Sequence, residues 1–345
     1  MRGRYLALFF VLLLSLAACS RAPLHHQEAF VFGTRVEVLI AGKSEAEARP
    51  AAAAVLREFD RLHRSYHAWK PSELSRLNDA IAAGRRQQVT PEMAALIVEA
   101  QRLSLAGEGL FDPGIGRLIS LWGFQSDDLP TTLPAASAVA AWQAARAGVA
   151  DLRLDDTDVS SRRRQVALDF GGYLKGVALD RAASILKAQG VHNALINIGG
   201  NVLALGTKNG QRWRVGIQHP RRPGPLATVE LDDGEAIGTS GDYQRYFEVD
   251  GKRYCHLLDP RSGQPVMHTQ AVTVLVTARM AAGTLSDVAS KPLFIAGTDW
   301  PRLARQLQVE HVLRVDAEGR WQVSRAMQDR LKYVGDRPAA LEIIP

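Results

Sequence analysis

The sequence predicts an α/β (α+β) fold, in which mixed sheets and packed helices form a single compact domain, either undivided or with two lobes. In the first half of the chain, apolar residues recur every three or four positions over several segments, which indicates amphipathic helices. In the second half, shorter alternating or continuous apolar runs predominate and indicate strands. The 345 residues, of which 46% are hydrophobic and 23% charged, suffice for such a fold.

The chain begins with the features of a bacterial lipoprotein signal. Arg2 and Arg4 precede an apolar run over residues 6–16, which is too short to span a bilayer, and small residues lead from this run to Cys19. We expect lipid on Cys19 to anchor the protein to a bacterial membrane, facing the periplasm; secretory cleavage nearby is the alternative. The expected division is a signal peptide at 1–18, a lipid-anchored tether at 19–28, the folded domain at 29–335 and a C-terminal tail at 336–345.

The net charge of +6 arises from basic residues scattered along the chain. The two short basic runs, at 162–164 and 221–222, contain no interleaved aromatic residues, so a nucleic-acid-binding face is not predicted. The two cysteines, Cys19 and Cys255, cannot form a disulfide framework.

The first predicted elements are a strand, a helix and a loop. Residues 29–41 alternate as a strand does, with an interruption at 32–34. Ser44 and Glu47 have the spacing of a capping box, which predicts that a helix begins here. The polar and aromatic stretch at 66–78 is expected to be a loop.

Further helices and strands follow from local signals. Thr90 before Pro91 predicts the beginning of a helix, and Gly107 predicts its end. Asp250-Gly251 predicts a hairpin turn between two strands. The other expected helices are 134–148, 281–296 and 301–307, and the other expected strands are 193–206, 212–218, 226–231, 243–249, 253–258, 270–277, 311–315 and 321–323.

A glycine pair at 171–172 lies between a predicted strand at 166–168 and a predicted helix at 175–189. Glycine lets the backbone approach a ligand closely, and a helix N-terminus favours anionic groups such as phosphate. Asp169 and Lys175 bracket the turn. These features indicate a site for a phosphorylated ligand with a polar head, although a plain strand-to-helix connection would share them.

Several stretches, in order along the chain, resemble the ApbE family of FAD:protein FMN transferases. They are FGT (32–34), SELSRLN (72–78), GLFDP (109–113), DFGGYLKG (169–176) with Asp180, NIGG (197–200), TSGDY (239–243), HLLDPRSG (256–263), Asp287 and LFIAG (293–297). The resemblance implies an ApbE-like flavin transferase domain at 29–335. It also implies transfer of FMN from FAD to a serine or threonine hydroxyl of an extracytoplasmic flavoprotein subunit of a membrane redox complex, with Mg²⁺ as cofactor and AMP as product.

The resemblance also implies roles for individual residues. The family's FAD-binding positions fall on Phe32, Trp69, Leu110, Phe111, Asp112, Asp169, Lys175 and Val266. The metal positions fall on Gly172, through its carbonyl group, and on Asp287. Where the family pattern has a threonine four residues after this aspartate, the chain has Lys291, whose ammonium group cannot ligate a cation. Lys291 would contact the pyrophosphate or point away, with Ser290 or water completing the metal site.

His256 is the candidate general base, because histidine titrates near neutral pH and can take a proton from a hydroxyl. A histidine hydrogen-bonded within a sheet is the alternative. Two other functions fit the same residues: an FAD pyrophosphatase that yields FMN and AMP, and a flavin-binding lipoprotein without turnover. The sequence names neither the acceptor protein nor the membrane that would carry the anchor.

Overall fold

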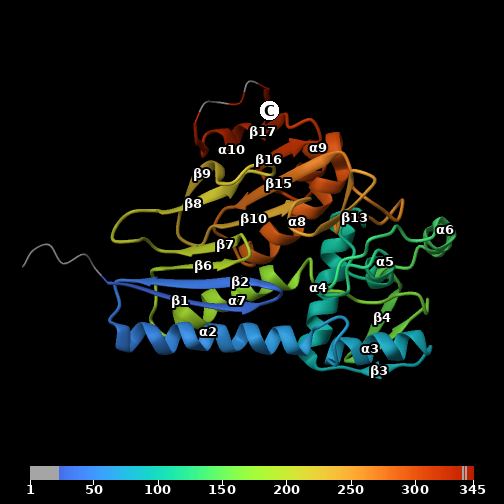
Figure 1. Ribbon diagram of the computed structural model, residues 1–345. Helices are drawn as coiled ribbons and strands as arrows, with labels where there is room; N and C mark the ends of the chain where they lie inside the picture. The colour runs from blue at the N-terminus through green and yellow to red at the C-terminus, as the bar shows by residue number, and fades with distance from the viewer. Residues whose placement is uncertain (1–22, 336–337, 339) are drawn as a thin grey trace, which may run out of the picture.

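A nine-stranded sheet forms the centre of the fold (Figure 1). The computed structural model describes residues 23–335, 338 and 340–345. Neighbouring strands are antiparallel, except for the last pair, which is parallel. In order across the sheet the strands are β1 (Leu24–Val31), β2 (Thr34–Ala41), β6 (Ala194–Ile198), β7 (Asn201–Leu205), β10 (Ala236–Gly241), β15 (Thr269–Val276), β16 (His311–Asp316), β17 (Trp321–Ser324) and β19 (Leu341–Ile344).

The sheet is buried on both faces, as β15 shows: all eight of its residues are buried, and five of them are apolar. Val272, Val274 and Val276 face the larger hydrophobic core, whereas Ala271 and Leu275 face a second core on the other side. Side chains alternate between the faces of a strand, so a strand covered on both sides needs apolar residues on both of its faces.

Most helices pack on the side of the larger core, and a small sheet together with α10 covers the other side. The long helix α2 packs against β1 and β2, α7 packs against β6 and β7, and α8 packs against β10 and β15. The helices are α2 (Glu45–Ser65), α3 (Glu73–Ala82), α4 (Pro91–Ala106), α5 (Gly116–Leu121), α6 (Ala136–Ala145), α7 (Leu174–Ala188), α8 (Ala282–Ala296), α9 (Trp300–Gln306) and α10 (Arg325–Gln328), with 3₁₀ turns η2 (Val149–Asp151) and η3 (Gly297–Asp299). The covering sheet consists of β18 (Lys332–Tyr333), β9 (Pro225–Leu231) and β8 (Trp213–Gln218).

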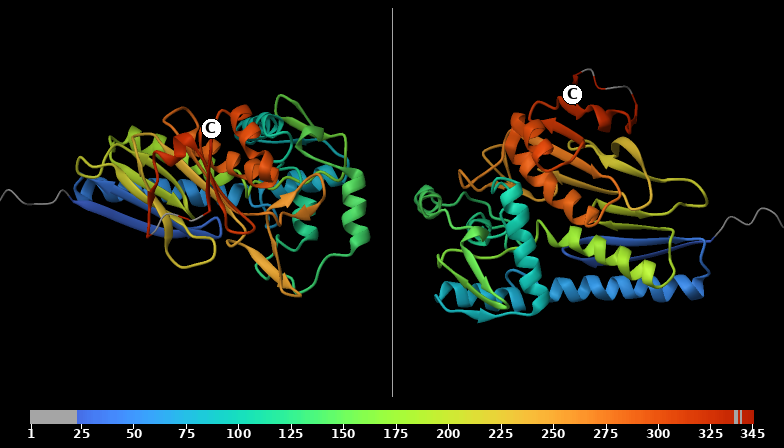
Figure 2. Two further views of the ribbon diagram at one scale, coloured as in Figure 1. Left: turned by 90° about the horizontal axis from the view of Figure 1, so that it is seen from above. Right: turned by 180° about the vertical axis from the view of Figure 1, so that it is seen from behind.

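A smaller part of the molecule, built around α3 to α6, lies at one end of the sheet (Figure 2). Helices α3 and α4 contribute to the larger core, whereas α5 and α6 lie in a third hydrophobic cluster, in which Trp122 and Phe124 pack against Phe247. The remaining strands are β3 (Gln87–Gln88), β5 (Asp158–Ser161) and β4 (Leu152–Asp155) in one sheet, and the pairs β11 (Tyr246–Val249) with β12 (Lys252–Cys255) and β13 (Leu258–Asp259) with β14 (Gln264–Pro265).

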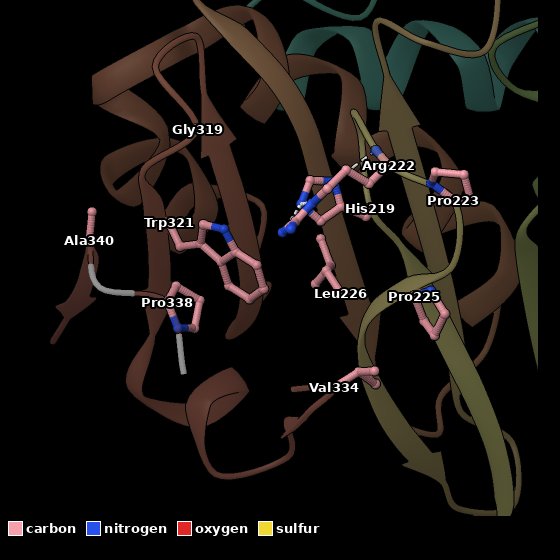
Figure 3. Close-up of a pocket in the computed structure, with 10 residues that line it drawn as sticks. All are labelled: His219, Arg222, Pro223, Pro225, Leu226, Gly319, Trp321, Val334, Pro338 and Ala340. Atoms are coloured by element: carbon pink, nitrogen blue, oxygen red, sulfur yellow. Dashed lines mark hydrogen bonds between the residues drawn. The ribbon is translucent and has the colours of Figure 1, made fainter. Parts of the chain in front are cut away.

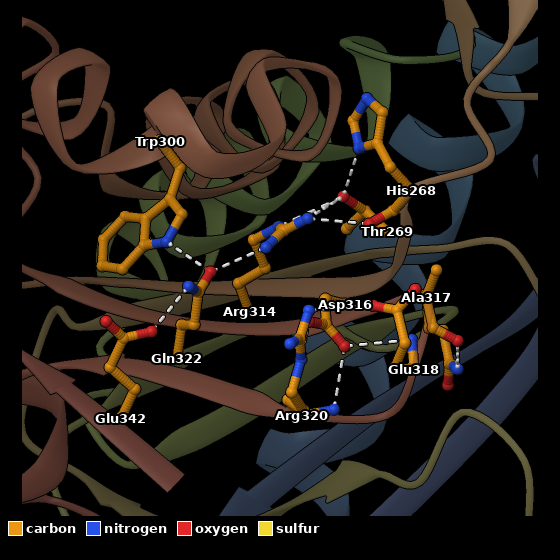
Figure 4. A network of polar contacts seen from close by, with 11 residues as sticks. His268, Thr269, Trp300, Arg314, Asp316, Ala317, Glu318, Arg320, Gln322 and Glu342 are labelled. Carbon is orange, nitrogen blue, oxygen red and sulfur yellow. Dashed lines mark hydrogen bonds and ion pairs between the residues drawn. The ribbon is translucent and has the colours of Figure 1, made fainter. Parts of the chain in front are cut away.

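A buried arginine ties the far end of the sheet together (Figure 4). The Arg314 guanidinium on β16 donates to Thr269 Oγ1 on β15 (3.1 Å) and to Gln322 Oε1 on β17 (2.6 Å). Gln322 Nε2 in turn donates to Glu342 Oε2 on β19 (2.8 Å), and Trp300 Nε1 of α9 donates to Gln322 Oε1 (3.3 Å). The network therefore connects four strands and a helix.

Most predicted elements are present, including the helix after Ser44, the helix that begins at Pro91 and the hairpin at Asp250-Gly251. Three predictions are wrong. Part of the expected loop at 66–78 is α3, because the Ser72 hydroxyl accepts from Ser75 N (2.9 Å) and caps the helix. Strand β10, which includes the first three residues of the TSGDY stretch, is absent from the predicted strands. The expected strand at 166–168 is reduced to one bridge, between Ala167 and Ile115.

Both expected domain borders also differ from the structure. The first strand, β1, begins at Leu24, within the expected tether, because it pairs along its whole length with β2. Residues 341–344, expected in a tail, form β19 by pairing with β17. The signal peptide and Cys19 lie outside the described residues. Within the described residues, no helix combines the length and the apolar character needed to cross a membrane.

Candidate active site

The glycine-rich turn before α7 is shaped by Asp169. Its Oδ1 accepts a hydrogen bond from Gly171 N (2.8 Å), and its Oδ2 accepts one from Gln125 Nε2 (2.8 Å). Lys175 lies in the first turn of α7, half-buried. The predicted phosphate-binding turn thus places an acid, two glycines and a lysine around the N-terminus of a 15-residue helix.

Helices α7 and α8 approach each other closely at a pair of glycines. A Cβ atom at Gly176 would lie 2.7 Å from the Gly283 carbonyl oxygen, and one at Gly283 would lie 2.9 Å from the Gly176 carbonyl oxygen. Asp180 of α7 fixes the N-terminus of α8, because its carboxylate accepts hydrogen bonds from Gly283 N and Thr284 N (both 2.8 Å). Burial raises the pKa of Asp180, and the bonds from Thr284 and Gly283 oppose that rise.

This packing brings Asp287 of α8 to the beginning of α7. Its Oδ2 accepts a hydrogen bond from Gly176 N (2.9 Å). The Lys291 ammonium group donates to Asp287 Oδ1 (2.6 Å) and to the Asp287 carbonyl oxygen (2.7 Å). The Lys291 side chain also lies against Gly172, where an added Cβ would meet its Cε at 2.9 Å. Lys291 therefore connects the two residues predicted to hold the metal, Gly172 and Asp287.

His256 lies beside these groups in the segment between β12 and β13. Its Nδ1 is 3.0 Å from the Arg245 carbonyl oxygen, which can only accept, so Nδ1 carries the proton and Nε2 is left as an acceptor. Burial lowers the pKa of His256 to about 4, and the positive charges of Lys175 and Lys291 act in the same direction. The imidazole is therefore neutral near pH 7 and able to accept a proton at Nε2.

Phe32 and Trp69, both predicted to bind FAD, stand at the two ends of a row of rings. The ring centroids are 5.7 Å apart for Phe32 and His63, 5.0 Å for His63 and His67, and 4.5 Å for His67 and Trp69. The two histidines were not found from the sequence. His63 lies in the last turn of α2, and His67 lies just beyond the end of that helix, two residues before the predicted Trp69. Tyr66, the neighbour of His67 in the chain, has its ring centroid 6.1 Å from that of Phe170, so this row lies near the glycine-rich turn.

The remaining predicted residues differ in their surroundings. Phe111 and Leu110 are buried, and Phe111 faces Gly172 and the Tyr173 ring. Val266 is buried beside the His256 segment, where its N–H donates to the Leu257 carbonyl group (2.9 Å).

Asp112 holds a loop together. Its Oδ1 accepts hydrogen bonds from Gly114 N (2.7 Å) and Val149 N (2.9 Å). Burial raises the pKa of Asp112 to about 6 despite these bonds. Its predicted contact with FAD stays a prediction, and a small hollow of about 160 Å³ beside it is lined also by Gly109 and Arg261.

Two other features lie away from this site. A surface hollow of about 410 Å³, lined by His219, Arg222 and Trp321 among others, contains none of the predicted residues (Figure 3). Among the described residues, one group of three potential metal ligands occurs, His26 with Glu28 and Glu37, on the β1–β2 hairpin.

The groups around Asp287 do not fit Mg²⁺ as they stand. Mg²⁺ requires oxygen ligands at short distance in near-octahedral geometry. A cation bound to Oδ1 and the carbonyl oxygen of Asp287 would share both atoms with the positively charged Lys291. Ser290, the alternative ligand, is 1% exposed, and its hydroxyl donates to the Asp287 carbonyl group (2.8 Å). The predicted Mg²⁺ site is therefore filled by Lys291.

The fold is that of an α/β protein, and the candidate site lies where the glycine-rich turn before α7 meets α8. Residues 32–313 match the model of the ApbE family, and this chain belongs to that family. The resemblance expected from the sequence motifs is thus confirmed.

The relatives agree with this assignment. A protein of Rhodobacter capsulatus named FAD:protein FMN transferase is 40% identical over 325 residues, which cover 94% of this chain and 61% of the relative. A Klebsiella pneumoniae protein of the same name is 34% identical over 261 residues, 72% of each chain. The solved structure of an ApbE protein from Thermotoga maritima matches with a TM-score of 0.81 and 30% identity, covering 89% of this chain and 99% of that one. This likeness confirms the predicted α/β fold.

Proposed function

We propose that this protein is an FAD:protein FMN transferase, which moves FMN from FAD onto a serine or threonine hydroxyl of another protein. The names of its relatives support the reaction. The single observation that carries it for this chain is His256, a neutral imidazole that turns Nε2 away from its Arg245 contact and stands near Lys175 and Lys291. A base beside two cations suits attack by a hydroxyl on a pyrophosphate.

In the proposed reaction, the acceptor hydroxyl loses its proton to His256 Nε2 as its oxygen forms a bond to the FMN phosphorus. The bond between that phosphorus and the bridging oxygen breaks, and AMP leaves with this oxygen. Lys175, at the N-terminus of α7, neutralises charge on the pyrophosphate. Phe32 and Trp69, in the row of rings, offer flat apolar area for a ring of FAD.

We further propose that the acceptor is an extracytoplasmic flavoprotein subunit of a membrane redox complex. The basis is the lipoprotein-like signal that ends at Cys19, which would hold the protein on a membrane at the periplasmic side. Replacing Cys19 by serine should release the protein from the membrane fraction. Unchanged membrane association of Cys19→Ser would contradict the anchor without touching the proposed chemistry.

Mixing the protein with FAD and a candidate acceptor subunit tests the transfer. Intact-mass spectrometry should find one FMN added to the acceptor, and chromatography should find an equal amount of AMP. Release of AMP and free FMN without acceptor would instead assign an FAD pyrophosphatase. Tight FAD binding with neither product would assign a flavin-binding protein without turnover, a reading that the filled metal position favours.

A further inference from the structure

Lys291 is a nearly buried cation held by a single residue. Its side chain is 14% exposed and that of Asp287 is 1% exposed. A lysine is seldom buried unless it is paired, because its ammonium group is strongly hydrated. Here the Asp287 carboxylate and carbonyl oxygens, at 2.6 and 2.7 Å, take two of the three ammonium protons. One N–H remains for a ligand.

The two oxygens that hold this ammonium group are of the kind that bind divalent cations. A carboxylate oxygen and a backbone carbonyl oxygen, converging on one point, are the ligands that a hard divalent cation prefers. In this chain they converge on Lys291 Nζ. The second carboxylate oxygen of Asp287 is engaged by Gly176 N (2.9 Å), so the carboxylate is fixed in the orientation that serves the lysine.

The neighbouring hydroxyls are engaged as well. Ser290 Oγ donates to the Asp287 carbonyl group, and Ser240 Oγ lies 2.7 Å from Ser290 Oγ. Ser290 has one proton to donate, so Ser240 is the donor in the second bond. Both side chains are at most 5% exposed. The protons of both hydroxyls are therefore engaged within the protein, and neither hydroxyl donates to a ligand of Lys291.

The surroundings of Lys291 favour an anion. Its stem lies on Gly172 in the turn before α7, and its charge repels that of Lys175 in the first turn of that helix. Two like charges near a helix N-terminus are stabilised when an anionic group lies between them. A pyrophosphate is such a group, and lysine binds phosphate oxygens as a point charge.

We propose that the Lys291 ammonium group replaces a divalent cation at Asp287 and, with Lys175, binds the pyrophosphate of FAD. This protein then binds FAD without a metal ion at Asp287. The inference rests on the proposed function, since it takes FAD as the ligand, and it concerns binding, which can be measured separately from transfer.

Equilibrium binding of FAD, followed by quenching of flavin fluorescence, tests the proposal. The protein is titrated in EDTA and in Mg²⁺ at one ionic strength, so that screening is matched. For the unaltered protein we expect Kd values within about twofold of each other. Loss of one charge-assisted contact costs roughly 1.5–3 kcal/mol, so Lys291→Thr should weaken binding in EDTA by about tenfold or more. Mg²⁺ should restore the affinity of this variant, because threonine leaves Asp287 free for the ion.

Two further variants keep the test decisive. Lys291→Met preserves the stem and should also weaken binding in EDTA, in case Lys291→Thr does not fold. Lys187→Thr, an exposed lysine near the other end of α7, should leave binding unchanged. Elemental analysis of the purified FAD complex should find no stoichiometric magnesium in the unaltered protein.

The outcomes separate this proposal from the one it rests on. If FAD binding to the unaltered protein falls tenfold or more in EDTA and returns with Mg²⁺, Lys291 does not replace the metal and only this inference fails. If FAD binds without metal but no acceptor is modified, the transfer fails and the role of Lys291 stands. Failure to bind FAD under either condition overturns both.

Discussion

At the scale of single residues, we expect a change at His256 to affect the rate of FMN transfer and not the binding of FAD. Replacing it by asparagine keeps an N–H donor for the Arg245 carbonyl group but removes the base. General-base catalysis contributes about 10²–10⁴-fold, so His256→Asn should slow FMN transfer by about 100-fold or more. FAD affinity should change by less than about threefold, because the imidazole is not among the cations that bind phosphate. If His256→Asn retained a tenth or more of the transfer rate, His256 would not be the general base.

The low pKa of His256 also predicts how the stability of the protein depends on pH. Burial lowers the pKa from its usual 6.5 to about 4, so the unfolded chain takes up this proton more readily than the folded chain. The free energy of unfolding should therefore fall as the pH drops from 6.5 towards 4. Above pH 6.5 the imidazole is neutral in both states, and the stability that its neutral form contributes is fully present. Thermal unfolding from pH 7 to 5 should show a steeper loss for the unaltered protein than for His256→Asn. If the melting temperatures of the two proteins fell equally with pH, the low pKa of His256 would be contradicted.

Individual residues show what the sequence could and could not predict. Asp287 and Lys291 were singled out by the family pattern, but only the structure shows that the lysine donates to both the carboxylate and the carbonyl oxygen of the aspartate. Phe32 and Trp69 were predicted from the family pattern. His63, in the last turn of α2, and His67, just beyond it, join these two rings; neither was singled out, because neither belongs to the motifs that carry the family resemblance.

At the scale of elements, the beginning of α8 decides where Asp287 stands. Asp180 accepts the N–H groups of Gly283 and Thr284, and Asp180→Ala leaves both without that partner. Loss of a helix cap costs about 1 kcal/mol, and burial of the freed N–H groups adds to it. We expect a loss of about 1–3 kcal/mol in denaturant unfolding, together with weaker FAD binding. The exposed Asp329→Ala should change stability by less than about 0.5 kcal/mol and leave FAD binding unaltered.

The close contact of α7 with α8 gives a further prediction. A methyl group at Gly176 would lie 2.7 Å from the Gly283 carbonyl oxygen and 2.8 Å from Asp287 Cβ, distances that backbone and buried atoms cannot relieve locally. Gly176→Ala should cost about 1–3 kcal/mol through overpacking and should disturb the bond from its N–H to Asp287. Calorimetry of this variant beside Ser184→Ala, an exposed change on the same helix, measures the effect. Equal stability of the two variants would show that the helices can separate freely.

Elements with a strong local signal were predicted well, and weak ones were not. Helix α4 has a threonine cap, a proline in its first turn and a glycine after its last residue. Strand β10 contains Gly238, over which the Ser286 carbonyl group of α8 passes so closely that no side chain would fit. From the local sequence alone, a glycine such as Gly238 indicates a loop. The helix that requires a glycine here lies almost fifty residues further along the chain, so the local sequence does not show the contact.

At the scale of the whole molecule, the site exists only because distant segments meet. Phe111 comes from the smaller part, Gly172 from the turn before α7, His256 from the segment after β12, and Lys291 from α8. The sequence predicted the α/β class, since that depends on local periodicity. The order of the nine strands depends on long-range pairing, which one sequence does not encode in a readable pattern.

A ligand that bridges these segments should stabilise the molecule as a whole. With free FAD at 100 times its Kd, binding to the folded state alone adds about 2.7 kcal/mol. For a chain of this size each kcal/mol raises the melting temperature by about 2–4 °C or less, so calorimetry should record a rise of a few degrees. AMP and FMN, which are each only part of FAD, should give smaller shifts in melting temperature.

His256→Asn should keep the rise in melting temperature caused by FAD, whereas Lys291→Met in EDTA should lose most of it. An equal rise in both variants would mean that FAD binds somewhere other than between α7 and α8.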